Sequence, residues 1–160
     1  MRKFIILSLL VGSFLITPLY SQSYVHLYST WNAVEFDTCA SAWLIKRFID
    51  KSAQFKFFPN GELITEGIAF DTPDAEIRRQ GNMSAYEVIL QKYKIKDPTL
   101  IEIGKIVHEI EVAYWGETSQ ISKGLGKKIM NIINKTEDKQ ECFQKSFEVF
   151  DDLYEKMKKQ

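Results

Sequence analysis

His108 and Glu111 could do chemistry together, because they stand three residues apart in a segment of helical periodicity. Side chains at that spacing lie side by side on one helix face, and histidine–carboxylate pairs of this kind bind divalent metal ions. A metal site needs a third ligand, and Glu87 and Asp71 are acids near the ends of other expected elements. We predict a divalent metal ion held by His108, Glu111 and Glu87. Alternatively, His108 bonds a backbone carbonyl at the core edge while Glu111 faces water.

A second candidate is the run Arg78-Arg79-Gln80-Gly81-Asn82-Met83-Ser84, which leads directly into an expected helix. Free N–H groups and the positive end of the helix dipole attract anions at such a start, and guanidinium groups bind oxyanions. We predict that Arg78 and Arg79 contribute to an anion site here. In the alternative, the run is a charged loop whose arginines face water.

Arg47 joins Asp71 and Glu87 in the predicted site. Arg47 lies on the side of Trp43 and is placed to hold Asp71 or Glu87. Glu87 is also the N3 residue of a capping-box pattern, which is a complete structural role in itself. Since buried charges need partners, we expect one partly enclosed cleft with His108 within reach of Glu87 or Asp71. The predicted ligand-binding residues are Arg47, Asp71, Arg78, Arg79 and Glu87.

The motifs of common enzyme classes are missing from this sequence. It has no pattern typical of a Ser–His–Asp triad, a P-loop, a dinucleotide fingerprint or HExxH, and it has two histidines, His26 and His108. Catalytic residues are therefore not predicted. Binding or sensing is favoured over catalysis, and a metal-dependent redox or hydrolytic enzyme stays open as the alternative, as does a structural domain whose site has decayed.

The elements that must position these side chains begin with short strands. Alternation and β-branched or aromatic residues predict strands over 24–30, 54–58 and 67–71, and a further strand over 75–79. Asp37 is a suitable N-cap for a helix over 37–51, with apolar residues at helical spacing.

The second half of the sequence is typical of helices. The capping box at Ser84 opens a helix to about Lys94, and Asp97-Pro98 begins the next. A weaker helix is expected over 122–134, and Thr136 is the expected cap of the last one. The expected core stripes are Leu100, Ile103, Val107, Ile110 and Tyr114, then Phe143, Phe147, Phe150, Tyr154 and Met157. The predicted fold class is α+β, a small β-sheet packed against a mainly helical C-terminal half.

Composition and the first residues predict an exported protein. The chain has 160 residues, 45% of them hydrophobic, and 21 basic residues balance 21 acidic ones, which excludes a strongly basic nucleic-acid binder. Arg2-Lys3, the apolar run over 4–16 and the small Ser21 predict a signal peptide over 1–21. The run is too short to span a bilayer, so no membrane anchor is expected after cleavage. Residues 22–160 are then one domain, periplasmic or secreted.

Cys39 and Cys142 have two open interpretations. In an oxidising compartment they could pair and close a long loop, whereas the apolar surroundings of Cys39 favour a buried free thiol.

Several segments together resemble the chromate-resistance family, the C-terminal domain of ChrB-type proteins that also occurs alone as an exported protein. They are Asp37 to Asp50, Ile68-Ala69-Phe70-Asp71, Gly81 to Glu87, and Val107-His108-Glu109-Ile110-Glu111. The resemblance covers about residues 28 to 155. It implies a module that binds or senses a small inorganic oxyanion such as chromate, or an accompanying metal ion.

The sequence departs from the pattern of that family at four positions. Family members carry arginine where this chain has Trp31 and Thr38, and they often carry histidine and cysteine where it has Arg79 and Ser84. The resemblance therefore implies a site with altered metal ligands, in which Arg79 partly compensates for the two missing arginines.

Overall fold

A three-stranded parallel sheet organises the first half of the protein. The structure is a computed structural model that describes residues 26–113 and 118–159. Strand β1 (Leu27–Trp31) lies between β2 (Gln54–Phe58) and β3 (Ile68–Ala69). In the register, Leu27 pairs with Gln54 and Tyr28 pairs with Ile68. Parallel neighbours need a crossover, and the chain makes it between β1 and β2 through a helix.

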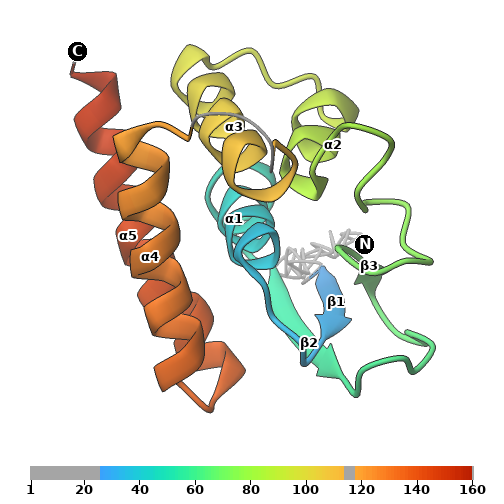
Figure 1. Ribbon diagram of the computed structural model, residues 1–160. Helices are drawn as coiled ribbons and strands as arrows, with labels where there is room; N and C mark the ends of the chain where they lie inside the picture. Colours follow the sequence, from blue (N-terminus) through green and yellow to red (C-terminus); the bar gives the residue numbers. More distant parts are fainter. Residues whose placement is uncertain (1–25, 114–117, 160) are drawn as a thin grey trace, which may run out of the picture.

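That crossover is α1 (Phe36–Leu44), which continues as one π-helical segment, η1 (Ile45–Ile49). Figure 1 shows α1 between the sheet and the pair formed by α4 (Gln120–Lys135) and α5 (Lys139–Lys158). Helices α2 (Ala85–Lys92) and α3 (Pro98–Glu111) complete the helical layer. The predicted α+β class is confirmed, with strands early and helices late.

The core is aromatic where α1 meets α5. Trp43 has no exposed surface and stacks on Phe150, with ring centroids 5.4 Å apart. The apolar stripes predicted for α3 and α5 face this core. Leu100, Ile103, Val107, Phe143, Phe147 and Phe150 are buried, whereas Ile110, Tyr154 and Met157 are partly buried against it. The stripe residue Tyr114 and the predicted signal peptide over 1–21 lie outside the described residues.

Several predicted element ends are wrong. The first helix begins at Phe36 with Glu35 as its N-cap, because Glu35 and Thr38 form a capping box. Thr136 ends α4, and Asp138 caps α5 because its carboxylate accepts the N–H of Glu141 at 2.7 Å.

Two other predicted boundaries also move. The expected strand over 75–79 is reduced to a single bridge between Phe70 and Ile77. Helix α4 begins at Gln120, with Ser119 as its cap.

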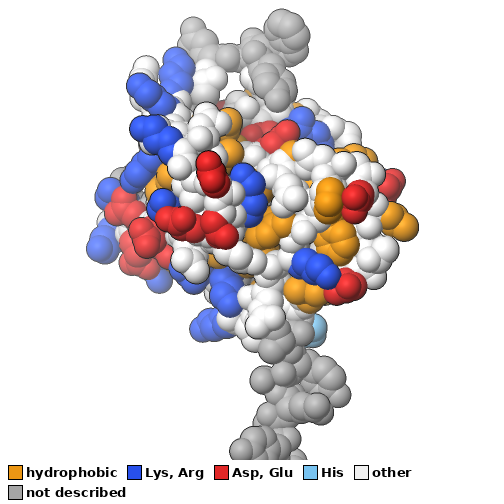
Figure 2. All heavy atoms as spheres, turned by 90° about the horizontal axis from the view of Figure 1, so that it is seen from below, with side chains coloured by type: hydrophobic (Ala, Val, Ile, Leu, Met, Phe, Trp, Pro, Cys, Tyr) orange, Lys and Arg blue, Asp and Glu red, His pale blue; other side chains and the backbone are white. Residues whose placement is uncertain are grey.

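The surface view gives the distribution of charge on one face. Figure 2 shows acidic and basic side chains interspersed on the helical side of this face, with smaller hydrophobic patches toward the sheet side. Among the described helices, none is both long and apolar enough to cross a membrane.

Candidate functional site

The candidate site lies where β1 and β3 end and α1 begins. The chain runs from β1 through α1 to β2, which lies on one side of β1. Strand β3 then pairs with the opposite side of β1. Crevices at such a switch point, outside the carboxyl ends of parallel strands, are where open sheets bind ligands. A cavity of about 250 Å³ opens here, and we call it the switch-point cleft. It is lined by Glu35, Asp37, Asp71, Thr72, Pro73, Arg78, Arg79 and Glu111.

Asp37 joins the cleft to the start of α2. Its carboxylate accepts the N–H of Ala85 at 2.6 Å and that of Tyr86 at 3.0 Å, and only 2% of the residue is exposed. Burial raises the pKa of Asp37 to about 6, although these two N–H bonds oppose the shift. An acid of α1 therefore supplies the acceptor for two backbone donors at the start of another helix.

This contact corrects the predicted anion cradle at the start of α2. The capping box is present, since Ser84 Oγ accepts the N–H of Glu87 at 3.2 Å and Glu87 Oε2 accepts the N–H of Ser84 at 2.8 Å. With Asp37 on the N–H groups of Ala85 and Tyr86, the protein's own acids and hydroxyl occupy the donors that would attract an anion. The arginines before this helix line the switch-point cleft instead.

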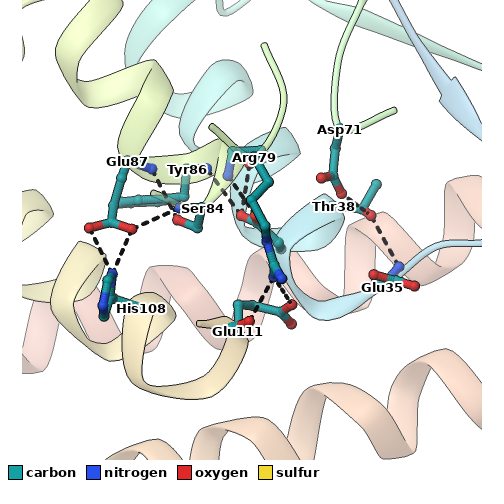
Figure 3. Close-up of polar contacts among 12 residues, drawn as sticks. Glu35, Thr38, Asp71, Arg79, Ser84, Tyr86, Glu87, His108 and Glu111 are labelled. Carbon is teal, nitrogen blue, oxygen red and sulfur yellow. Dashed lines mark hydrogen bonds and ion pairs between the residues drawn. The ribbon is translucent and has the colours of Figure 1, made fainter. Parts of the chain in front are cut away.

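Asp71 is held on the other side of the cleft. Figure 3 shows Thr38 between Asp71 and Glu35; its hydroxyl donates to Asp71 Oδ2 at 2.5 Å and accepts the N–H of Glu35 at 3.1 Å. Asp71 has a φ of 50°, in the left-handed region that costs a non-glycine residue energy. Burial, followed by the nearby charge of Asp37, raises the pKa of Asp71 to about 7.

Arg79 and Glu111 form another part of the wall of the switch-point cleft. Arg79 Nη2 donates to the backbone carbonyl of Glu111 at 2.7 Å and to its carboxylate at 3.0 Å (Figure 3). Only 8% of Glu111 is exposed, and burial raises its pKa although Arg79 opposes the shift. The Arg79 side chain is 43% exposed. Arg78 also lines the cleft and donates to the carbonyl of Ala75.

The expected contact of His108 with Glu87 is confirmed, but the prediction of one common cleft is wrong, because neither residue lines the switch-point cleft. His108 Nδ1 lies 3.0 Å and 3.2 Å from the two carboxylate oxygens of Glu87, beside the first turn of α2 (Figure 3). Glu111, three residues further along α3, turns to Arg79 instead. The structure therefore divides the predicted metal set of His108, Glu111 and Glu87 between two places. Within 26–113 and 118–159, no three His, Cys, Asp or Glu residues are grouped to hold a metal ion.

The predicted role of Arg47 is wrong. Its guanidinium binds Asp151 of α5 through two nitrogens, at 3.0 Å and 2.8 Å, and Trp43 Nε1 donates to the same carboxylate at 2.7 Å. Arg47 lies in η1, beyond the carboxyl end of α1, whereas Asp71 lies at the amino end of α1. The length of the helix therefore separates Arg47 from the cleft.

Sequence reasoning missed Glu35, Asp37 and Thr38 as site residues. A signal was present, because these polar residues directly follow the first strand and begin the first helix. Three positions at which the sequence departs from the resembled family also gather here. Trp31 and Thr38 line a hollow of about 350 Å³ next to the switch-point cleft, and the two cavities share Glu35, Asp71 and Pro73. Arg79, the third of these positions, lines the cleft itself. The fourth, Ser84, caps α2 next to the N–H groups that Asp37 accepts.

A comparison with known protein families decides which family the chain belongs to. The chain matches the family described as ChrB, C-terminal domain, over residues 28–157. The chain belongs to the ChrB C-terminal domain family. The resemblance noted from the sequence motifs is thereby confirmed, and family membership supports a function related to chromate resistance.

A curated relative is similar to part of the chain. The relative, Protein ChrB of Cupriavidus metallidurans strain CH34, is 31% identical over 78 residues, which cover 48% of this chain. The matched segment spans 24% of that protein's length. No solved structure matches this chain.

Proposed function

We propose that this ChrB-family domain is an exported module that binds or senses a small inorganic oxyanion, such as chromate, in the switch-point cleft. The observation that carries the proposal is Arg79, which Glu111 holds in the wall of a cleft that the buried Asp37 and the half-buried Asp71 also line. A guanidinium has five N–H donors in a fixed fork, and Arg79 uses Nη2 for Glu111, so its other nitrogens can reach a ligand. Arg78 lines the same cavity and adds a second positive charge.

The size of the cleft fits a small hydrated ion. A cavity needs only about 10–15 Å³ of free space to hold one water molecule, so the 250 Å³ of the cleft has room for several small polar species. That space accommodates a tetrahedral oxyanion together with bridging water molecules. The adjoining hollow beside Trp31 and Thr38 offers further room.

Four acids line this cleft, so an anion must bind with protons. Ionised Glu35, Asp37, Asp71 and Glu111 would repel a dianion, whereas a protonated carboxyl group is neutral and donates a hydrogen bond. The raised pKa values allow Asp71 to lose its charge at about neutral pH, where its pKa lies at about 7, and Asp37 to lose its charge below its pKa of about 6. Oxyanion binding is therefore expected to strengthen as pH falls from about 8 to about 5.5.

The test measures binding by calorimetry with chromate and with sulfate at about pH 5.5 and about pH 8. Sulfate stays a dianion over that range, so a pH effect on its affinity comes from the protein. Arg79→Gln is expected to weaken binding by about 10- to 100-fold, the value of a charge-assisted hydrogen bond. Arg47→Gln is the matched control, because Arg47 is 40% exposed and bonded to a carboxylate but lies outside the cleft. An equal loss in both variants contradicts the proposal.

A divalent metal ion is the second candidate ligand, favoured by the carboxyl groups of the cleft. Its pH dependence has the opposite sign, because protons compete with a cation for carboxylates. Metal analysis of the purified protein, with Mn²⁺ and Zn²⁺ as added probes, tests it. Stoichiometric metal that is lost in His108→Ala would place the ion at the His108–Glu87 pair instead, as the sequence motif predicted.

Export is tested separately on the protein recovered from the producing cell. The intact mass is expected to lack residues 1–21, because the basic start, apolar run and small Ser21 form a cleavage signal. A mass that still includes Met1 to Ser21 would contradict export by cleavage.

A further inference from the structure

Helix α4 carries positive charge without any negative charge. Its 16 residues contain no aspartate or glutamate, and its basic residues are Lys123, Lys127, Lys128 and Lys135. Each of the other described α-helices contains at least one acidic residue. Since the whole chain balances 21 basic residues with 21 acidic ones, the rest of the chain carries more acidic than basic residues. The protein therefore has one positively charged helix in an otherwise acidic chain.

The lysines of α4 lie on its exposed face and are not paired with acids. On the opposite face, Leu125, Gly126 and Ile129 are buried and hold the helix against the protein. All four lysines are exposed. No ion pair within 26–113 and 118–159 uses a lysine of α4, whereas five lysines of other elements are paired with acids. The ammonium groups of α4 are thus available to an external anionic partner.

Two acids near α4 are engaged in other contacts. Glu109 of α3 accepts two hydrogen bonds at the capped start of α4, at 3.0 Å and 2.6 Å. Asp152 of α5 binds Lys156 at 2.6 Å, and this bond is the main cause of its lowered pKa, to which the charge of Lys128 adds. Neither carboxylate forms an ion pair with α4.

Two exposed apolar side chains accompany the lysines. Ile121 is 57% exposed and Met130 is 42% exposed. Met130 follows Lys127 by three residues, so the two side chains are neighbours on the helix surface. Ile121 precedes Lys128 by seven residues, which is two helical turns, so these also share one stripe. Nucleic acid presents phosphates at its surface, whereas a membrane presents phosphates above an apolar layer. The mixture of lysines and exposed apolar side chains therefore favours a membrane.

The position of α4 suits a flat partner. Figure 1 shows the pair of α4 and α5 on the far side of α1 from the sheet. Basic side chains line the upper left edge of the face in Figure 2, on the side where Figure 1 places this pair. Attraction between exposed charges extends about 10 Å in 0.1 M salt. A flat anionic surface against α4 is thus attracted by its lysines, whereas a long polyanion that wraps the protein would also meet the acidic remainder.

We propose that the exposed face of α4 is a docking surface for a membrane that contains anionic phospholipid. The lysines donate hydrogen bonds to the lipid phosphates, while Ile121 and Met130 contact the boundary between headgroups and acyl chains. Since this face is already exposed, docking needs no rearrangement of the fold. No residue of α4 lines the switch-point cleft, so docking and oxyanion binding use separate surfaces.

The experiment acetylates the full chain beside vesicles and follows each lysine by peptide mass spectrometry. Vesicles of phosphatidylcholine with about one third phosphatidylglycerol are the probe, and vesicles of phosphatidylcholine alone are the reference. We expect Lys123 and Lys127 to lose most of their reactivity beside the anionic vesicles only, and to regain it in about 0.5 M salt. Lys92 of α2, which is paired with Glu76, should react equally in all samples. The apolar run over 4–16 can enter both kinds of vesicle, so the difference between them reports on α4.

Two double variants measure the affinity by co-sedimentation with the anionic vesicles. Lys123→Gln with Lys127→Gln is expected to weaken binding about 25-fold, because each lysine near an anionic surface strengthens binding roughly fivefold. Lys92→Gln with Lys105→Gln is the matched control. It removes the same charge from two lysines of α2 and α3 that are paired with acids, and it should leave binding unchanged.

Equal reactivity of Lys123 and Lys127 beside both kinds of vesicle would overturn the proposal, and so would equal weakening in the two double variants. Fluorescence anisotropy with a labelled DNA duplex tests the other polyanion. Tighter binding to DNA than to the anionic vesicles would assign the lysines to nucleic acid and also overturn the proposal. The footprint uses the wild-type chain, so a folding defect in a variant does not affect it. Because sulfate binding is measured separately, failure here and failure of the oxyanion proposal are distinguishable.

Discussion

Replacing Asp71 with asparagine removes one charge from the switch-point cleft while keeping the shape of the side chain. Asparagine retains an oxygen that can accept the hydroxyl of Thr38, and it tolerates the left-handed backbone at φ 50°. The pKa of Asp71 is raised from 3.8 to about 7, so the folded chain holds this proton more tightly than the unfolded chain. The free energy of unfolding of the wild type therefore falls as pH rises from about 4 to about 7.

The Asp71→Asn variant has no carboxyl group at this position, so its free energy of unfolding does not show that fall with rising pH. A shift of about three pKa units corresponds to at most about 4 kcal/mol, and the half-buried position of Asp71 reduces it to about 2 kcal/mol. At about pH 8, Asp71→Asn is thus expected to be more stable than the wild type by about 2 kcal/mol, or roughly 5–10 °C in Tm. At about pH 3, below the unfolded value of 3.8, the two proteins should be almost equally stable, because Asp71 is then mostly protonated in both states.

Urea unfolding, followed by tryptophan fluorescence at both pH values, measures the difference. Asp74→Asn is the control, since Asp74 is an exposed acid three residues further along the same turn. It should change stability little at either pH. If Asp71→Asn destabilises the protein equally at both pH values, its carboxyl group is not penalised by burial, and the argument for proton-linked binding in the cleft fails with it.

Three further substitutions, two of them with a matched control, test how the fold positions the site. Gly67→Ala should lower the free energy of unfolding by more than about 2 kcal/mol, because Gly67 has φ +78° and a Cβ there would lie 2.6 Å from a β1 carbonyl oxygen. Gly61→Ala, with φ +80° and no described atom within 4 Å of such a Cβ, should lose only about 1 kcal/mol in the same denaturation assay. Ile103→Ala truncates a fully buried side chain of α3 and should lower the free energy of unfolding by about 2–5 kcal/mol. Ile101 is 40% exposed and serves as its control, so a similar loss for Ile101→Ala would refute the assigned core face of α3. Asp37→Ala leaves two buried N–H groups without an acceptor, at a cost of about 2–6 kcal/mol, and hydrogen exchange should show faster opening of α2 than of α3.

Local patterns in the sequence predicted the helices well. The stripe of α3 and the capping box at Ser84 were both readable, because each depends on residues within a few turns of one another. Where two capping residues stand close together, the local pattern does not decide between them, and the predicted cap Thr136 is wrong. Thr136 and Asp138 both suit an N-cap, and only the course of α4 decides that Thr136 belongs to its end.

Among the site residues, one predicted contact is confirmed and another is wrong. The contact of His108 with Glu87 was expected from two motifs and is present. The partner of Arg47 was predicted wrongly, because that partner is Asp151, more than a hundred residues away on α5. A guanidinium pairs with the nearest carboxylate that packing brings to it, and the spacing of residues along one helix contains no information about that.

The sequence by itself determined the α+β class, the family motifs, the main apolar stripes and the acids and arginines available for binding. These follow from periodicity and residue type, which act over a few residues at a time. The tertiary structure alone decided which of these groups share a cleft. It turned Glu111 from His108 to Arg79 and placed Asp37 on the backbone of α2. Each of these contacts joins separate elements, so each depends on how the helices pack on one another and on the sheet.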